Sequence, residues 1–422
     1  MTPGRIGDRK ARVSRVFHPP GSVRARGCYE ALAVAQHLGD NTGFRLWSGW
    51  RCCGYLPMPG FDFAPAWTFL SALGTAPLRP LHTFVRTTEE RLRPPRVELH
   101  RPAVRRAADA LAAPEELGAR VLREQGSGRV PTIVLGGFVP DSSEQVFLLR
   151  RFLLRSGDLF CLNYPREAFS LDAICAQISD LVDECNERGT PPVIFGVSFG
   201  AGIVLEWLRR GRVAGWERKL AGVVLVSPVT CIADILAAGV AKPATLLGRA
   251  VLPFLADREV PAAAIEKSRA IFVRMFEAGA QNRKALQLIM SRAEVERLRA
   301  AVLGTIRGIT AEGARQRVRA LREMEEPTAY FRPGLLPLTR APALVLFAER
   351  EEAVLDAGSP AAFAFEHGCR GFFPGGRALR VRGRPYAAPV QHASLIFHVF
   401  EFLPALQRFY QGVRSAPLRL AA

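Results

Sequence analysis

Residues 191–211 constrain the fold of this chain more than any other stretch. They read PPVIFGVSFGAGIVLEWLRRG. Val193 to Phe195 form a short apolar run that is typical of a buried parallel strand, and from Phe199 onward the apolar residues follow helical spacing. Between them lies Gly-Val-Ser-Phe-Gly, in which the two glycines remove side chains that would clash across a sharp turn. The stretch therefore predicts a strand, a tight turn and a helix, with Ser198 at the tip of the turn.

Strands and helices alternate on both sides of this unit. Buried strands are predicted at 132–135, 159–162, 221–227 and 343–347, with a last strand at 377–382. Helices are predicted at 143–154, 171–185 and 394–409. Two leading strands, at 81–86 and 97–100, and an Ala-rich helix at 102–125 are expected ahead of them. This alternation predicts an α/β fold with a mostly parallel central sheet and helices on both faces.

By composition the chain divides into an N-terminal region, a core and an insertion. Residues 1–27 are basic and poor in apolar side chains, so they are predicted to form a disordered tail. Residues 28–80 form an aromatic extension that is broken by prolines. The core is expected at 81–230 and 341–415. Between its two parts, residues 231–340 contain amphipathic helical stretches and no strand-like run, which predicts a helical cap.

The formal net charge of +18 raises the question of an anionic partner. Most of the 57 basic residues are arginines scattered through helices and loops, with no basic stripe interleaved with aromatic residues. We therefore expect no nucleic-acid partner. For the aromatic extension at 28–80, packing on the core and peripheral contact with a membrane surface both stay open. The oligomeric state is left open as well.

The eight cysteines show no C-x-x-C pair and no clustering with the histidines, so neither a metal site nor a cofactor is expected. Most of them lie in apolar runs, as is typical of reduced cysteines in a cytoplasmic protein. No apolar segment of the signal-peptide type follows the first charged residues. The apolar stretch at 55–81 is broken by prolines and by Asp62, which argues against a membrane-spanning helix.

Residues 81–412 resemble the α/β-hydrolase superfamily, most specifically at GVSFG (196–200), GGF (136–138) and QHASL (391–395). The resemblance implies a nucleophilic serine, an acid and a histidine in that order along the chain, each on a loop at the carboxyl edge of the sheet. Ser198 stands at the position of the nucleophile. A serine there argues against dehalogenase and epoxide-hydrolase chemistry, because those reactions need a carboxylate nucleophile.

The nucleophile needs a base, and the base needs a carboxylate to hold its tautomer. Of the three histidines that follow Ser198, His367 and His398 fall in predicted helices. His392 lies in the loop after the last strand, where the family places its base.

The acid is expected after the strand at 343–347. Aligning the turn that follows this strand with the family places Glu351 where relatives commonly have aspartate. Glu352, Asp356 and Asp234 remain alternatives.

Attack on a carbonyl builds negative charge on its oxygen, and backbone N–H groups must already point at that oxygen. Phe199 offers one such N–H at the N-terminus of the helix after Ser198. The resemblance implies that Phe138 offers the second, in the loop where relatives read H-G-aromatic and this chain reads Gly-Gly-Phe.

These residues predict a serine hydrolase that cleaves an ester, a thioester or a related small acyl substrate through an acyl-enzyme. The cap would shape an apolar pocket for this substrate. Two alternatives stay open. The same residues could serve acyl transfer or carbon–carbon bond hydrolysis, or the chain could be a hydrolase-like binding protein without catalysis. The sequence does not identify the substrate.

Overall fold

The computed structural model describes residues 91–96, 103–104, 106 and 118–415, apart from 238, 241, 257, 280–285, 287–289 and 384–387. The predicted tail at 1–27, the aromatic extension at 28–80 and the expected strands at 81–86 and 97–100 lie outside the described residues.

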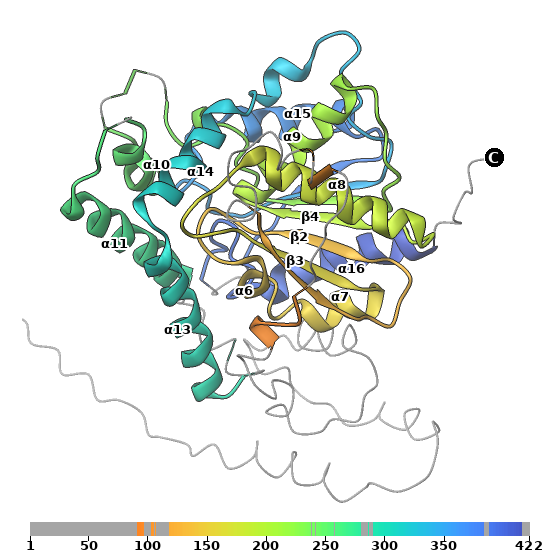
Figure 1. Ribbon diagram of the computed structural model, residues 1–422, viewed down its shortest axis with the longest axis horizontal. Coiled ribbons are helices and arrows are strands. Elements are labelled where there is room, and N and C mark those ends of the chain that lie inside the picture. Colours follow the sequence, from red (N-terminus) through yellow and green to blue (C-terminus); the bar gives the residue numbers. More distant parts are fainter. Residues whose placement is uncertain are drawn as a thin grey trace, which may run out of the picture. The chain divides into compact units, whose positions relative to one another are not determined.

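A seven-stranded sheet forms the centre of the described chain (Figure 1). Its strands are β1 (Arg120–Glu124), β2 (Thr132–Leu135), β3 (Leu159–Asn163), β4 (Val193–Val197), β5 (Gly222–Val226), β6 (Ala343–Phe347) and β7 (Arg377–Arg380). They are arranged in the order β1-β3-β2-β4-β5-β6-β7. Only β1 runs antiparallel to its neighbour. The mostly parallel sheet confirms the predicted fold class.

The inner strands consist almost entirely of buried residues. Every residue of β2, β3, β4, β5 and β6 is buried. A parallel strand that is covered on both faces requires a nearly continuous apolar run, and this is the pattern from which these strands were predicted. The edge strand β7, by contrast, is mostly exposed.

The helix predicted at 102–125 is wrong at its C-terminal end. Residues 103, 104 and 106 are helical, but Arg120–Glu124 form β1. All five residues of β1 pair with β3 in antiparallel register, and Val121 and Leu122 are buried. The helix propensity of an Ala-, Leu- and Arg-rich segment is a weak preference. Pairing with the open edge of a buried sheet outweighs it.

Helices cover both faces of the sheet (Figure 1). On one face lie α8 (Leu171–Glu187), α9 (Phe199–Val213) and α15 (Pro360–Phe372), and on the other α7 (Arg150–Ser156) and α16 (Val399–Ser415). Trp207 on α9 donates from Nε1 to the Ser179 hydroxyl on α8 at 3.0 Å. On the other face, the Tyr410 hydroxyl of α16 hydrogen-bonds to that of Thr132 in β2 at 3.0 Å. None of the described helices is both long and apolar enough to cross a membrane.

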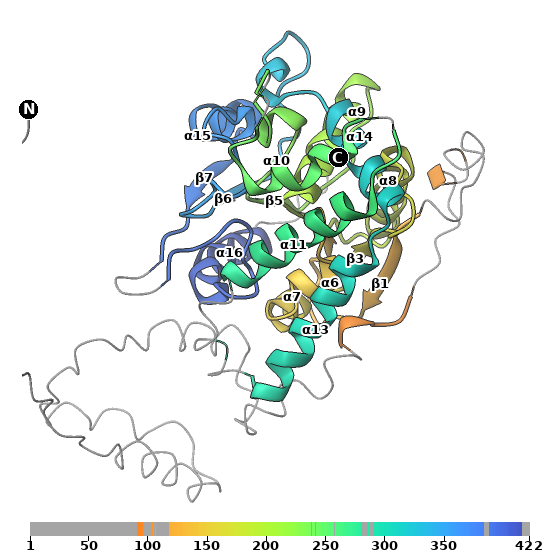
Figure 2. The same ribbon diagram turned by 90° about the vertical axis from the view of Figure 1, so that its left-hand side faces the viewer.

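Between β5 and β6, the described residues form helices, turns and loops but no strand. The longer ones are α10 (Leu246–Val251), α11 (Ala262–Gly279), α13 (Arg292–Gly308) and α14 (Ala311–Glu323). Figure 2 shows α11 and α13 in front of the sheet and its helices. We refer to α10, α11, α13 and α14 as the cap helices. Ser291 and Thr310 begin α13 and α14, and each hydroxyl accepts a bond from a backbone N–H of the first turn.

Candidate active site

Ser198 lies on the sharp turn between β4 and α9. Its backbone has φ 52° and ψ −116°, a region that residues other than glycine rarely adopt. Two hydrogen bonds hold it there, from Ser198 N–H to Val226 O at 2.8 Å and from Val229 N–H to Ser198 O at 3.1 Å. The strain is therefore maintained by contacts with the end of β5 and the loop that follows it.

The two glycines that flank Ser198 are required by close backbone packing. A Cβ atom on Gly196 would lie 2.6 Å from the Cα of Ala201. A Cβ atom on Gly200 would lie 2.5 Å from the carbonyl oxygens of both Leu135 and Gly136. Since these neighbours are backbone atoms, neither position can accommodate a side chain unless the turn moves.

The structure brings Ser198, His392 and Glu351 together from three loops. The Nε2 atom of His392 lies 2.9 Å from the Ser198 hydroxyl oxygen. On the other side of the ring, Nδ1 hydrogen-bonds to Oε2 of Glu351. The two side chains of this second pair are less than a tenth exposed. A hydroxyl, an imidazole and a carboxylate are thus connected in one chain of hydrogen bonds.

Glu351 is held by more than the histidine. Its Oε1 atom accepts from the backbone N–H of Ala348 at 2.5 Å and from the hydroxyl of Ser227 at 2.8 Å. The same hydroxyl accepts from the N–H of Ala393 at 3.1 Å. Ser227, which the sequence marked only as the end of a strand, therefore joins the turn of the acid to the loop of His392.

The three alternative acids are engaged elsewhere. Asp234 is fully buried, and its carboxylate accepts five hydrogen bonds from Thr230, Cys231, Ser359 and Ala361. Glu352 is exposed and pairs with Arg350. Asp356 accepts from the N–H of Gly358 at 3.0 Å. None of these three carboxylates contacts His392 in the described structure.

The two other histidines lie apart from this chain of hydrogen bonds. His398 is 1% exposed and its Nδ1 lies 3.1 Å from the Ser394 hydroxyl oxygen. Burial lowers its pKa to about 4, so its imidazole is neutral near pH 7. His367 is exposed on α15, beside the ring of Phe363.

The residues predicted as oxyanion donors lie close to each other. The rings of Phe138 and Phe199 pack edge to face with centroids 5.6 Å apart. Within the described structure, neither backbone N–H donates to a protein acceptor. Both donors are therefore available to a bound oxygen atom, as an oxyanion hole requires.

Side chains fix the loop that carries Phe138. The Tyr164 hydroxyl donates to Gly136 O at 3.1 Å, and the Gly137 N–H donates to Oε1 of Gln145 at 2.8 Å. Arg317 of cap helix α14 donates to the carbonyl oxygen of Phe138 and, at 2.8 Å, to that of Pro165. Arg317 is 2% exposed, and this burial lowers its pKa to about 10. The sequence gives no signal for this role of Arg317.

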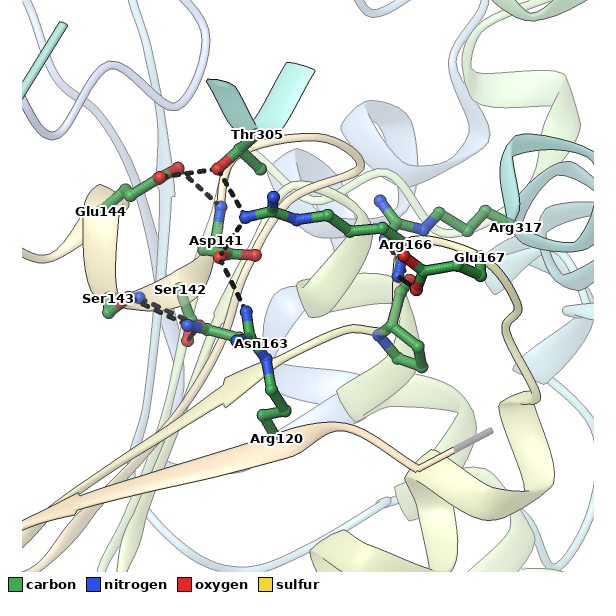
Figure 3. A network of polar contacts seen from close by, with 11 residues as sticks. Arg120, Asp141, Ser142, Ser143, Glu144, Asn163, Arg166, Glu167, Thr305 and Arg317 are labelled. Carbon is green, nitrogen blue, oxygen red and sulfur yellow. Dashed lines mark hydrogen bonds and ion pairs between the residues drawn. The ribbon is translucent and has the colours of Figure 1, made fainter. Parts of the chain in front are cut away.

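A buried polar network extends from the same loop to the cap (Figure 3). Thr305 of α13 donates from its hydroxyl to Oε1 of Glu144 at 2.7 Å and accepts from Arg166 at 3.1 Å. Arg166 also bonds to Asp141, at 3.4 Å. Burial is the main cause that raises the pKa of Glu144 to about 7, with the nearby Asp141 carboxylate adding to it. The network fastens α13 to the helix that follows the loop of Phe138.

A cavity of about 160 Å³ opens beside Ser198 and His392. Most of its wall is apolar and comes from the cap helices and from the segment around His392. The main apolar side chains are Phe138, Val139, Leu246, Leu247, Phe272, Met275, Phe276, Ile306, Val354, Ile396 and Phe397. Apart from His392, none of the described lining residues is ionisable. In the described part of the chain, no group of three candidate metal ligands is found.

Comparisons with known proteins agree with this architecture. The family model described as "Serine aminopeptidase, S33" matches residues 167–369, a range that includes Ser198 and Glu351 but ends before His392. No curated protein matches the sequence. With the sheet order and the turn at Ser198, the family match places the chain in the α/β-hydrolase superfamily.

Two solved structures illustrate the likeness. One is a protein from Burkholderia cenocepacia described as a "putative aryl esterase", at 16% identity and a TM-score of 0.47 over 71% of this chain and 98% of that one. The other is the esterase RhEst1 from Rhodococcus, at 16% identity and a TM-score of 0.47 over 70% of this chain and 98% of that one.

Asp234→Asn tests the structural role of this buried carboxylate. The amide would turn an NH₂ group toward donors that now bond to oxygen, so we expect a loss of about 3 kcal/mol in the free energy of unfolding. Urea unfolding followed by circular dichroism measures it. Asp356→Asn is the matched control, because that carboxylate makes one exposed bond, and it should cost less than about 1 kcal/mol. Equal stability of the two variants would contradict the role of Asp234.

Proposed function

We propose that the protein is a serine hydrolase that cleaves an uncharged acyl substrate, an ester or a thioester, through an acyl-enzyme. The observation that carries the proposal is the chain of hydrogen bonds from Glu351 through His392 to Ser198, which ends at an apolar cavity. In this proposal Ser198 is the nucleophile, His392 is the base, and Glu351 holds the base.

The geometry supports a two-step reaction. As the Ser198 oxygen attacks the acyl carbon, Nε2 of His392 takes the hydroxyl proton, and Glu351 stabilises the imidazolium through Nδ1–H. The carbonyl oxygen becomes negative and accepts from the N–H groups of Phe138 and Phe199. The bond to the leaving group then breaks, and His392 returns its proton to that group. A water molecule then attacks the acyl-enzyme in the same way, with His392 as the base, and the acid product is released.

The cavity supports an apolar acyl chain as substrate. Its described lining residues offer aromatic and aliphatic side chains but no lysine or arginine to pair with a carboxylate group of a ligand. Burial of each methylene is worth about 0.8 kcal/mol, so a chain that fills the cavity gains binding energy without ionic contacts. The convergence of Ser198, His392 and Glu351 supports catalysis over the alternative of a binding protein.

Labelling by a fluorophosphonate tests the nucleophile. Wild-type protein should be labelled covalently, since the probe needs an activated serine, whereas Ser198→Ala should not be. In-gel fluorescence measures labelling, and thermal unfolding confirms that the variant is folded. Ser268→Ala is the control that should still be labelled, because its hydroxyl donates to Ala264 O within α11 and does not line the cavity. Labelling that persists in folded Ser198→Ala would contradict the proposal.

The role of Glu351 predicts a specific loss of turnover. In Glu351→Gln, the amide can favour the wrong imidazole tautomer, and the corresponding change in the template serine protease lowers kcat by about 10⁴. We expect a decrease of this order at unchanged KM in steady-state kinetics with a chromogenic ester. Glu352→Gln is the matched control, because Glu352 is the exposed neighbour, and its kcat should stay within about twofold. Comparable kcat values in both variants would contradict the role of Glu351 and assign the acid to another residue.

Met275 of α11 lines the cavity, so its size should influence which length of acyl chain the protein prefers. Met275→Ala should lengthen the cavity and shift the preferred acyl chain to longer esters, because each methylene that gains a place is worth about 1–3 kcal/mol in kcat/KM. A series of p-nitrophenyl esters of increasing length measures the shift. Met324→Ala removes an equally large buried side chain that does not line the cavity, so it should lower stability and leave the preference unchanged. If the preferred acyl-chain length of Met275→Ala equals that of wild type, the acyl chain does not bind against Met275.

A further inference from the structure

We propose that Gln145 is a third hydrogen-bond donor to the oxyanion, acting through its side-chain Nε2 beside the backbone N–H groups of Phe138 and Phe199. The inference rests on the proposed function, because it needs a carbonyl oxygen that becomes negative at Ser198. Gln145 ends the short helix α6 (Ser142–Gln145), is 7% exposed, and lines the same cavity as Ser198.

The orientation of the Gln145 amide follows from its contact with the loop of Phe138. Its Oε1 atom accepts from the N–H of Gly137 at 2.8 Å. Because an N–H can only donate, the atom at the Gly137 N–H must be the amide oxygen, and the other branch of the amide group must be Nε2 with its two hydrogens. The amide therefore presents its donor side in a single direction.

The Nε2 donor has no protein partner in the described structure. No hydrogen bond from it is found, and it is not among the fully enclosed polar atoms that lack a partner. It therefore reaches the cavity surface. Two other polar side chains among the described lining residues are already engaged: Nε2 of Gln391 donates to Pro389 O, and the Ser394 hydroxyl bonds to His398. An amide donor at the cavity surface without a protein acceptor is available to an oxygen atom of a ligand.

Gly137 shows how close this donor is to the nucleophile. A Cβ atom built on Gly137 would lie 2.9 Å from Nε2 of Gln145 and 3.5 Å from Cβ of Ser198. A side chain at position 137 would thus contact both the amide donor and the serine. The absence of a side chain at 137 keeps this space open, next to the N–H of Phe138.

The helix that carries Gln145 is anchored before any substrate arrives. Asn163 accepts from the Ser142 hydroxyl at 2.8 Å and donates to the Ser143 hydroxyl at 3.0 Å (Figure 3). Glu144 is bonded to Thr305 of the cap. A donor held in place in this way needs little reorganisation during the reaction, which is the condition under which an oxyanion donor contributes about 10²–10³ to the rate.

Two variants separate the donor from the acceptor of the same side chain. Gln145→Glu keeps an oxygen for the Gly137 N–H and removes the NH₂ group, while Gln145→Met removes both at similar length without adding charge. Gln177→Glu is the matched control. In wild-type protein, Oε1 of Gln177 on α8 accepts from the backbone N–H of Ala119, and Nε2 donates to the backbone oxygen of the same residue. Gln177 does not line the cavity.

We expect kcat and the rate constant of fluorophosphonate labelling to fall by about 10²–10³ in both Gln145 variants, at a KM within a few-fold of wild type. The affinity for a trifluoromethyl ketone, whose adduct carries the oxyanion, should fall by a similar factor. Gln177→Glu should keep wild-type values of all three quantities and lose only thermal stability. A structural defect at Gln145 would lower the melting temperature without this selective loss of affinity for the charged adduct.

Three results would overturn the inference. The first is wild-type labelling and turnover in both Gln145 variants, which leaves the proposed function intact. The second is a loss in Gln145→Glu alone, which would identify repulsion by the new carboxylate. The third is a rise in KM at constant kcat, which would assign Gln145 to ground-state binding. If wild-type protein itself is not labelled, the proposed function fails and this inference fails with it.

Discussion

The close contact between the start of α9 and the end of β2 is the constraint on which the rest of the site depends. Gly200 packs so closely against the carbonyl groups of Leu135 and Gly136 that no side chain fits between them. This contact places the N-terminus of α9 directly against the loop of Phe138. Backbone packing therefore holds the strained turn at Ser198 against the loop of Phe138, in addition to the side chains that fix this loop.

Glu351, the proposed acid, shows how the structure holds a longer side chain at a position where aspartate is the expected residue. Glu351 uses one carboxylate oxygen for His392 and the other for the Ala348 N–H and the Ser227 hydroxyl. These bonds replace the water that the carboxylate loses on burial and fix its orientation. The carboxylate of Glu351 is thus held by the turn itself, and it meets the imidazole of His392 in a defined position.

Much of the architecture could be predicted from the sequence because it follows from local patterns. Buried parallel strands require continuous apolar runs, and the turn at Ser198 requires its glycines, so both can be recognised in a short stretch of the sequence. The strand β1 was missed because its identity depends on pairing with β3, not on its own composition.

Some side chains near Ser198 act through contacts that cannot be read from a short stretch of sequence. These are Gln145, Ser227 and Arg317. Arg317 meets the carbonyl of Phe138 across 179 positions of the chain, and Ser227 meets Glu351 across 124. Gln145 is near the loop in sequence, but its orientation depends on a single bond to Gly137. Contacts of this kind become visible only when the fold has brought the segments together.

The bonds from Thr305 and Arg317 to the core have a mechanical consequence for the cap. Arg317 belongs to α14 but holds the carbonyl group next to a proposed oxyanion donor, and Thr305 belongs to α13 but bonds to the helix that carries Gln145. A movement of α14 away from the core must break the bond to Phe138, and a movement of α13 must break the bond to Glu144. The cap helices are therefore bonded to the loop and the helix that carry the proposed oxyanion donors, so a movement of these helices that widened the cavity would also disturb the proposed donors.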